Sequence, residues 1–396
     1  MSKVQVGSRL SSIKPFKAMQ VLRRAGELES QGYDVIHMEV GEPSFPTPAP
    51  IVAAGQTALS QGQTKYTDAR GIVELREAIS EYYRSDYGLE ISEERIFVTS
   101  GGSGALLLST ALLLNPGENI IMGDPGYPCN RHFMTVFSGS ATLVPVGVAE
   151  DYQLNESLLR AHWQESTRGV LLASPANPTG ALINETELTS MSSFISKKNG
   201  YLISDEIYHG LVYADDNKMS ALNVCADAFV VNSFSKYFGM TGWRLGWLIA
   251  PTWAVDEVEK LAQNLFICPS SIAQHAAVAA FSPAAREIME SQREALRTRR
   301  DFLLPALREL GFSIPREPDG AFYIYAGIPE GFSDCETFTN SLLEHHHVAI
   351  TPGTDFGNYL ANRHVRFSYT TEMDRLRGAV DRLAKAMQTS EFLVDE

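Results

Sequence analysis

The sequence predicts an α/β fold in which a large domain holds a seven-stranded, mostly parallel sheet between helices, and a smaller α+β domain follows it. Three observations indicate this arrangement. Short apolar runs rich in Val, Ile and Leu alternate with helical patterns between about residues 96 and 250. The pattern changes after about residue 285 to one long charged helix and three short strands. With 396 residues, 44% of them hydrophobic, the chain is long enough to bury two cores.

Seven apolar runs are the candidate strands of the large sheet. Continuous apolar runs indicate parallel strands that are covered by helices on both faces. Several of the runs end in Gly, Pro, Asp or Ser, and ligands of such sheets bind outside the carboxyl ends of the strands. The candidate strands are residues 95–100, 119–124, 141–148, 169–174, 201–206, 228–233 and 244–250.

The last part of the chain has a different pattern. Residues 284–310 form the predicted long helix, and the short strands 321–326, 347–352 and 364–370 follow it. This order predicts the smaller α+β domain. The sequence contains no repeat and no low-complexity linker between the two regions, so we expect the domains to be tightly joined.

Composition and charge exclude several classes of function. The formal net charge is −14, from 33 Lys and Arg against 47 Asp and Glu, which disfavours nucleic acid or an anionic membrane as a partner. The N-terminus has no apolar core of signal-peptide length, and no stretch reaches ~18 uninterrupted apolar residues. We therefore expect a cytoplasmic protein.

No metal site is predicted. The four cysteines are far apart and form no CxxC pair, which argues against both a zinc site and a disulfide framework. Consecutive residues of a helix or strand point in different directions, so we expect the run His345–His347 to be solvated or to cap a helix. The cysteines are Cys129, Cys225, Cys268 and Cys335.

Polar residues follow three of the predicted strands. Gly101, Gly102 and Ser103 come between a strand and a strongly helical run, where free backbone N–H groups can bind an anion such as a phosphate; a plain glycine-rich turn is the alternative. Asn177 lies in an Asn-Pro-Thr-Gly segment and is able to point its amide into the cleft, although the segment is also an ordinary turn. Asp205 ends an apolar strand, where a buried carboxylate needs a partner, unless it caps the next helix.

Lys236 stands alone among serines, glycines and aromatic residues in the stretch NSFSKYFGMTGWRLGW. It is either an exposed lysine or a lysine held in a pocket for its amine. Together, a phosphate site, a buried acid, an asparagine and an isolated lysine suit a pyridine aldehyde that has a phosphate group. The lysine would hold such a compound as a Schiff base.

Nearly the whole chain resembles the class I, fold type I aminotransferases, which use pyridoxal 5'-phosphate. Eight segments occur in the order typical of that family: GEPSF, YTDARGIVELREAI, SGGSGAL, DPGYP, NPTG, DEIY, SFSKYFGMTGWRLGW and VRFSYT. The resemblance implies transamination between an amino acid and a 2-oxo acid such as pyruvate or 2-oxoglutarate. It also implies a large cofactor-binding domain at residues 46–284 and a small domain at 285–396, to which the N-terminal segment 1–45 contributes.

The resemblance assigns the catalytic roles to three residues. Lys236 would hold the cofactor as a Schiff base and then move the proton between the substrate α-carbon and the cofactor. Asp205 would pair with the pyridinium nitrogen and keep it protonated, so that the ring accepts electrons. Tyr208, together with Asn177, would hydrogen-bond the phenolic oxygen.

The remaining implied residues bind the cofactor or the substrate. Tyr127 would stack on the cofactor ring, and Ser233 and Arg244 would join the glycines and Ser103 around the phosphate. Arg366, which lies mid-strand among apolar residues, would bind the substrate α-carboxylate; a structural salt bridge is the alternative. The complete implied set is Gly41, Asn177 and Arg366 for the substrate, and Gly101, Gly102, Ser103, Tyr127, Asn177, Asp205, Tyr208, Ser233, Lys236, Arg244 and Tyr66 for the cofactor.

Gly41 and Tyr66 are assigned roles outside the binding of the chain's own cofactor. Gly41 would let its backbone approach the substrate carboxylate, unless it is a plain turn glycine. Tyr66 matches a tyrosine that reaches the cofactor phosphate of the neighbouring subunit, which implies a homodimer with shared active sites.

Substrate choice and reaction type remain open at this stage. Phe16 and Met19, in the segment that resembles the substrate cover, favour a neutral or apolar amino acid. A carbon–sulfur lyase of the same fold would keep every cofactor residue. A non-enzymatic regulator with the same cofactor would need a DNA-binding module, for which the chain has no spare segment or basic patch.

Overall fold

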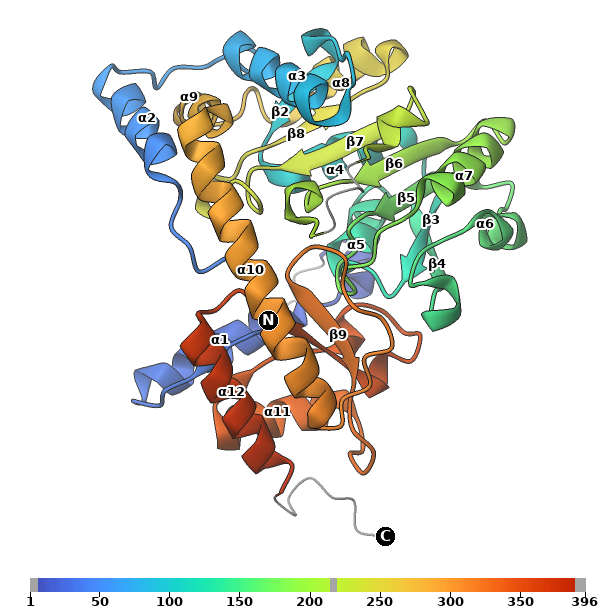
Figure 1. Cartoon of the computed structure of the whole chain (residues 1–396). Helices are drawn as coiled ribbons and strands as arrows, with labels where there is room; N and C mark the ends of the chain where they lie inside the picture. Colours follow the sequence, from blue (N-terminus) through green and yellow to red (C-terminus); the bar gives the residue numbers. More distant parts are fainter. Residues whose placement is uncertain (1–5, 214–218, 389–396) are drawn as a thin grey trace, which may run out of the picture.

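The computed structural model describes residues 6–213 and 219–388, and its centre is one large sheet (Figure 1). The strand order is β2-β8-β7-β6-β5-β3-β4, and only β8 runs antiparallel to its neighbours. All seven predicted strands are therefore confirmed, as is the mostly parallel sheet. Their bounds are β2 Ile96–Thr99, β3 Asn119–Asp124, β4 Ser140–Pro145, β5 Thr167–Ala173, β6 Tyr201–Asp205, β7 Phe229–Ser233 and β8 Gly246–Ile249.

Helices cover both faces of this sheet (Figure 1). Every residue of β7 and β8 is buried, which explains why these strands are continuous apolar runs. α4 (Gly101–Leu113) packs on both strands and begins two residues after β2 ends. The other helices around the sheet are α3 Val73–Tyr87, α5 Pro128–Val136, α6 Glu156–His162, α7 Glu185–Lys197 and α8 Val255–Leu265.

α10 (Pro283–Glu309) is the long helix that the sequence predicts, and in Figure 1 it connects the upper and lower parts of the molecule. Its start is set by Ser282, whose hydroxyl accepts the N–H of Ala285 at 3.3 Å, and by Pro283 in the first turn. Its upper end lies beside α2 (Ala49–Ser60) and α9 (Ser271–Val278) (Figure 1).

The lower part of the molecule contains two small sheets. β9 (Tyr323–Gly327), β12 (His364–Ser368) and β11 (Thr351–Pro352) form an antiparallel sheet, and β1 (Ile36–His37) pairs in parallel with β10 (Val348–Ala349). Beside these sheets lie α10 and three more helices (Figure 1). These are α1 Lys17–Ser30, α11 Cys335–His346 and α12 Met373–Ala386.

The predicted strand 347–352 is wrong in detail, because it is two short strands in different sheets. Ala349 pairs with His37, whereas Thr351 pairs with Arg366, so the chain changes sheets at Ile350. His347 belongs to neither strand. It ends α11 in the left-handed conformation, with φ 56°, and thus has the capping role expected for the histidine run.

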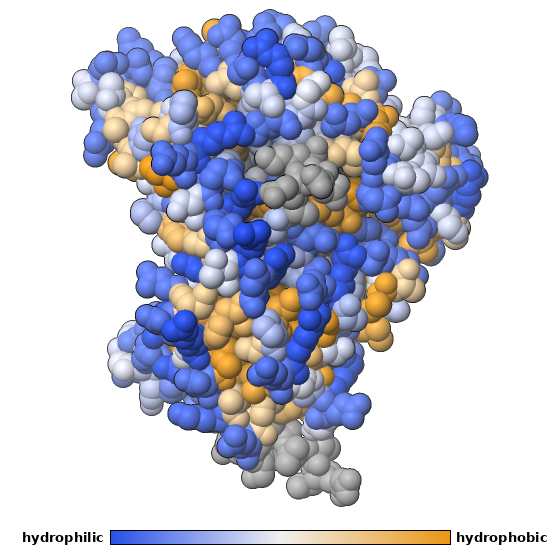
Figure 2. Space-filling model, in the orientation of Figure 1, coloured by the Kyte–Doolittle hydropathy of each residue, from blue (hydrophilic) through white to orange (hydrophobic). Residues whose placement is uncertain are grey.

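The surface is largely polar on the face shown in Figure 2, where apolar residues are scattered in separate patches. No helix of residues 6–213 and 219–388 has both the length and the apolar character to cross a membrane. The same residues contain no group of three His, Cys, Asp or Glu side chains placed to hold a metal ion. All four cysteines are free thiols.

Candidate active site

A cavity of about 540 Å³ opens at the carboxyl ends of the parallel strands, between the large sheet and the lower part of the molecule. The structure brings together at its wall eleven of the residues singled out in the sequence. The two others lie outside: Gly101 is at the start of α4, and Tyr66 is 82% exposed. The eleven are Gly41, Gly102, Ser103, Tyr127, Asn177, Asp205, Tyr208, Ser233, Lys236, Arg244 and Arg366.

Lys236 follows β7 by three residues and lines this cavity, where it is partly exposed. Its Nζ donates a hydrogen bond to the carbonyl oxygen of Gly41 at 2.7 Å. Burial, helped by the nearby charge of Arg366, lowers the pKa of the amine to about 8. A sizeable fraction is therefore neutral near physiological pH, which makes Lys236 a nucleophile and a proton acceptor rather than a fixed cation.

Asp205 is the last residue of β6, and its side chain is aimed into the same cavity. It is 4% exposed, and its Oδ1 accepts only the N–H of Ile207, at 3.3 Å. Burial raises the pKa of this carboxyl to about 7. Among the described residues it has no ion-pair partner, so the cavity holds a buried carboxylate that a cation from outside the chain would stabilise.

We expect this burial to make the stability of the ligand-free protein fall as pH rises. The pKa of Asp205 is about 7 in the folded state against 3.8 in an ordinary carboxyl, so the folded protein binds more protons between these values. The free energy of unfolding then decreases with pH across that window, by at most about 1.4 kcal/mol per pH unit. Denaturant unfolding between pH 4 and 8 should show this slope in the wild type and not in Asp205→Asn. Equal slopes in the two proteins would contradict it.

The N-terminus of α4 faces Arg244 across a narrow gap. Gly101 has φ 71°, and a Cβ atom there would lie 2.8 Å from Nη2 of Arg244, so only glycine fits. The side chain of Ser100 does not cap the helix, which leaves its first backbone N–H groups free. With Ser103 and Ser233 on the cavity wall, these groups form a cradle of donors suited to a phosphate.

Arg366 lies in β12 and is 2% exposed. Its guanidinium carbon is 4.1 Å from the ring centre of Tyr323 and 4.7 Å from that of Phe356. Nη1 donates to Oδ1 of Asn177 at 2.9 Å, and Nη2 donates to the carbonyl oxygen of Glu39. No carboxylate of the described residues pairs with it and its Nε has no partner, so the structural salt bridge considered from the sequence is not present.

Tyr323 is one of the lining residues that sequence reasoning missed. Its hydroxyl lies 2.9 Å from that of Tyr208, and burial raises the pKa of both hydroxyls. A Cβ at Gly41 would lie 1.7 Å from the Tyr323 hydroxyl, so Gly41 is required for this contact. The sequence gives no signal for it, because Tyr323 lies in a strand with a plain apolar pattern, far along the chain from Gly41.

The N-terminal segment covers one side of the cavity. Phe16 packs edge-on against Tyr127, with ring centres 6.0 Å apart, and Met19 and Leu22 line the wall from α1. The carboxylate of Asp355 accepts the N–H groups of Lys17 and Ala18, at 2.9 and 3.1 Å, and so fixes the start of that helix.

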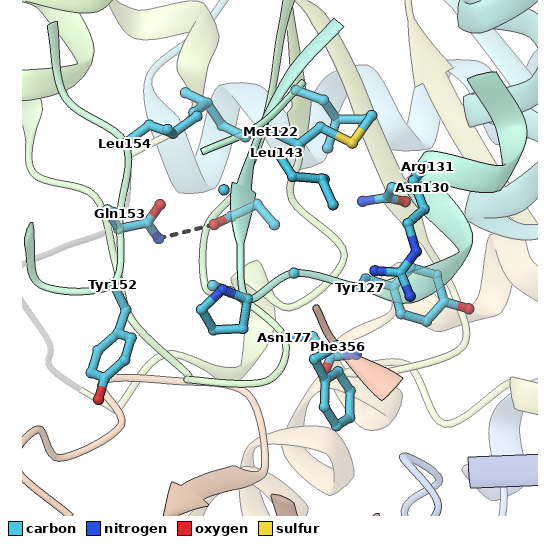
Figure 3. Close-up of a pocket in the computed structure, with 17 residues that line it drawn as sticks. Met122, Tyr127, Asn130, Arg131, Leu143, Tyr152, Gln153, Leu154, Asn177 and Phe356 are labelled. Carbon is cyan, nitrogen blue, oxygen red and sulfur yellow. Dashed lines mark hydrogen bonds between the residues drawn. The ribbon is translucent and has the colours of Figure 1, made fainter. Parts of the chain in front are cut away.

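A second, smaller cavity of about 50 Å³ lies behind Tyr127 and Asn177 (Figure 3). Gln153 closes one side, where its Nε2 donates to the carbonyl oxygen of Ala173 at 3.0 Å. Arg131 and Phe356 also border it. This cavity shares a wall with the main one but contains neither Lys236 nor Asp205.

Comparison with known proteins agrees with this geometry. The family model for aminotransferase class I and II matches residues 33–383. A valine–pyruvate aminotransferase from Mycobacterium tuberculosis is 37% identical, over 94% of this chain and 96% of its own length. An aspartate aminotransferase from Thermotoga maritima is 34% identical, over 96% and 98%.

The solved structures that resemble this chain are also aminotransferases. An aminotransferase crystal structure from Mycobacterium tuberculosis covers 97% of this chain and 99% of its own, with a TM-score of 0.93 and 37% identity. The Thermus thermophilus aspartate aminotransferase with maleate covers 96% and 99%, with a TM-score of 0.91 and 34% identity.

Proposed function

The chain belongs to the class I and II aminotransferases, and from this premise we propose that it is a pyridoxal-phosphate enzyme that transfers the amino group of a neutral or apolar amino acid to a 2-oxo acid. One observation supports the cofactor most directly. Asp205 is a buried carboxylate that pairs with no cation of the described residues, and it shares its cavity with the amine of Lys236. A protonated pyridine nitrogen would neutralise the first, and an aldehyde would react with the second.

The residues of the cavity fit each part of that cofactor. The α4 N-terminus, Ser103, Ser233 and Arg244 would hold the phosphate, and Tyr127 would lie against the ring. Tyr208 would donate its hydroxyl proton to the phenolic oxygen, since burial keeps that hydroxyl protonated. When bound, the cofactor supplies an electron sink for the bond that is broken at the substrate α-carbon.

The chain's own groups bind the substrate and move the proton. Lys236 would hold the cofactor covalently at rest, and its amine, whose pKa is lowered to about 8 by burial in the ligand-free chain, would accept and return a proton near neutral pH. Among the described residues, the guanidinium of Arg366 donates hydrogen bonds only to neutral oxygens, so a substrate carboxylate would be its charged partner. The rings of Tyr323 and Phe356 fix the plane of the guanidinium for that contact.

A neutral or apolar substrate side chain is supported by the rest of the wall. The cations among the described lining residues are Lys236, Arg244 and Arg366, each of which has another role, so none remains for a second carboxylate. Phe16, Met19 and Leu22 are the side chains that cover the opening. Among the relatives, the valine–pyruvate aminotransferase has a neutral substrate, whereas the Thermotoga enzyme acts on aspartate.

A single-turnover experiment tests the proposal. The purified enzyme, given an amino acid without acceptor, should convert its cofactor once to the amine form, seen by absorbance, and then stop until pyruvate or 2-oxoglutarate is added. A carbon–sulfur lyase would instead release 2-oxo acid and ammonia continuously. Valine, alanine, methionine, phenylalanine and aspartate should be compared, and a preference for aspartate would refute the neutral-substrate part alone.

We also propose a homodimer with shared active sites. Tyr66 is 82% exposed and is absent from the wall of its own cavity. An exposed aromatic side chain of this kind is suited to a subunit interface. The implied division into residues 46–284 and 285–396, with 1–45 joining the latter, is likewise proposed, and the pairing of β1 with β10 supports it.

We expect Tyr66→Phe to weaken cofactor retention by about tenfold, since one hydrogen bond to the phosphate would be lost from each partner site. Cofactor release on dialysis measures this, and sedimentation at assay concentration measures the dimer. Tyr33→Phe is the matched control, because Tyr33 is also an exposed tyrosine and is absent from the cavity wall. A fully active monomer would contradict the shared site.

A further inference from the structure

The loop of residues 353–359, between β11 and β12, contacts several parts of the site. Its Asp355 fixes the start of α1, as described above, and the carbonyl oxygen of Asp355 accepts Nη2 of Arg131 at 3.0 Å. The next residue, Phe356, packs on the guanidinium of Arg366. Its carbonyl oxygen accepts the N–H of Gly126 at 2.9 Å, in the turn that precedes Tyr127.

Asp124, the last residue of β3, holds the other end of this loop. It is 4% exposed, and its carboxylate accepts the N–H of Asn358 at 3.0 Å and that of Tyr359 at 3.3 Å. A Cβ at Gly357 would lie 1.6 Å from Oδ1 of Asp124, so the carboxylate occupies the space that any other residue at 357 would need. The end of β3 and residues 357–359, which are far apart in the sequence, are thus held together by the buried carboxylate of Asp124.

Phe356 is 1% exposed, and its ring packs edge-on against that of Tyr325 as well as on Arg366, but one side of it is not filled by other atoms. The ring borders the smaller cavity, next to Asn177 and opposite Leu143 (Figure 3). An unfilled space beside a ring removes the contacts that would otherwise hold it in place. The backbone bonds on either side of Phe356, to Gly126 and to Asp124, therefore act together with the Tyr325 contact to keep the ring against Arg366.

We propose that Asp124 is a positioning residue for substrate binding: through the 356–359 backbone it holds Phe356 on Arg366 and so orients the guanidinium toward the substrate carboxylate. This inference rests on the proposed role of Arg366. Asp124 itself would touch no substrate. Because it ends β3, the large sheet would nevertheless influence how tightly the substrate carboxylate binds. All amino acids should share the effect, because each presents the same α-carboxylate.

The test uses the cofactor-loaded enzyme and 3-methylbutanoate, which has a carboxylate and an apolar tail but no amine to react. Calorimetry should give a dissociation constant about tenfold higher in Asp124→Asn, since a charged acceptor of two backbone N–H groups is lost. KM should rise similarly for every amino acid while kcat and cofactor retention change little. A general structural defect would lower kcat and cofactor retention as well.

Three further single substitutions and one double variant make the outcome decisive. Phe356→Leu should weaken 3-methylbutanoate binding too, and its combination with Asp124→Asn should be no weaker than the worse single variant, because both act on the same ring. Gly357→Ala disturbs the contact between Asp124 and residues 357–359 from the loop and not from β3. It is used in place of Asp124→Asn if that variant fails to fold. Asp334→Asn is the matched control, since Asp334 also accepts two backbone N–H groups, at the start of α11, and should bind normally.

The outcomes separate the two proposals. If Arg366→Lys binds 3-methylbutanoate as the wild type does, the assignment of Arg366 fails. If Arg366→Lys is impaired but Asp124→Asn binds within about twofold of wild type, or if the losses in Asp124→Asn and Phe356→Leu simply add, the role of Asp124 is overturned and that of Arg366 stands.

Discussion

Lys236→Ala should lose at least about 10⁴-fold in transamination rate, the upper range for a positioned acid–base group. The described residues on the cavity wall offer no second lysine, so neither the covalent attachment nor the proton transfer has a substitute. Borohydride should fix cofactor to the wild-type chain and not to the variant. The cofactor itself is expected to remain bound, because the α4 N-terminus and Arg244 are unchanged.

Lys198→Ala is the control for this experiment. Lys198 is exposed at the end of α7, outside the cavity, so both its turnover and its borohydride labelling should match the wild type. Wild-type turnover in Lys236→Ala, or cofactor fixed by borohydride to that variant, would show that another amine does the chemistry.

Arg366→Lys is expected to cost about 2 to 5 kcal/mol of transition-state stabilisation, the usual loss when one partner of a desolvated charge pair is removed or misplaced. Lysine keeps the charge but has no planar fork, and it cannot lie flat between the rings of Tyr323 and Phe356. The fall in kcat/KM should be the same for every amino acid tested. A penalty confined to acidic substrates would instead place Arg366 in the side-chain pocket.

Arg76→Lys provides the comparison for that variant. Arg76 is another buried arginine that donates to backbone carbonyls, those of Gly71 and Glu93, but it lies in α3 away from the cavity. Its replacement should lower thermal stability without changing kcat/KM by more than about twofold. Equal kinetic losses in the two variants would indicate a general folding defect and not a substrate contact.

The seven strands and the polar residues that follow them were predictable because each depends on residues close together in the sequence. Strands covered on both faces must be apolar throughout, and the polar residue that ends such a strand lies at the ligand edge of the sheet, as Asp205 does. The family resemblance added the rest of the predicted wall. From it came Arg366, which the local pattern shows only as a charge in an apolar strand, and also Gly41, Tyr127, Tyr208, Ser233 and Arg244.

What the sequence could not show are contacts between distant segments. Tyr323 reaches Tyr208 only because Gly41 leaves room, and Asp124 holds residues 357–359 only because Gly357 has no side chain. Each contact requires a glycine without a Cβ in one segment and a side chain that fills the space in another, distant segment. Local patterns record neither, and the change of sheet at Ile350 is hidden for the same reason.

The pairing of β1 with β10 has a consequence for how the enzyme is made. Ile36 finds its strand partner in Val348, which the ribosome adds 312 residues later. At ordinary synthesis rates the N-terminal segment would wait about 15 to 60 s for that partner. The large sheet can form during this interval, but the carbonyl of Gly41 and the cover that includes Phe16 have no lower sheet to rest on. Nascent chains should therefore be inactive until translation is almost finished.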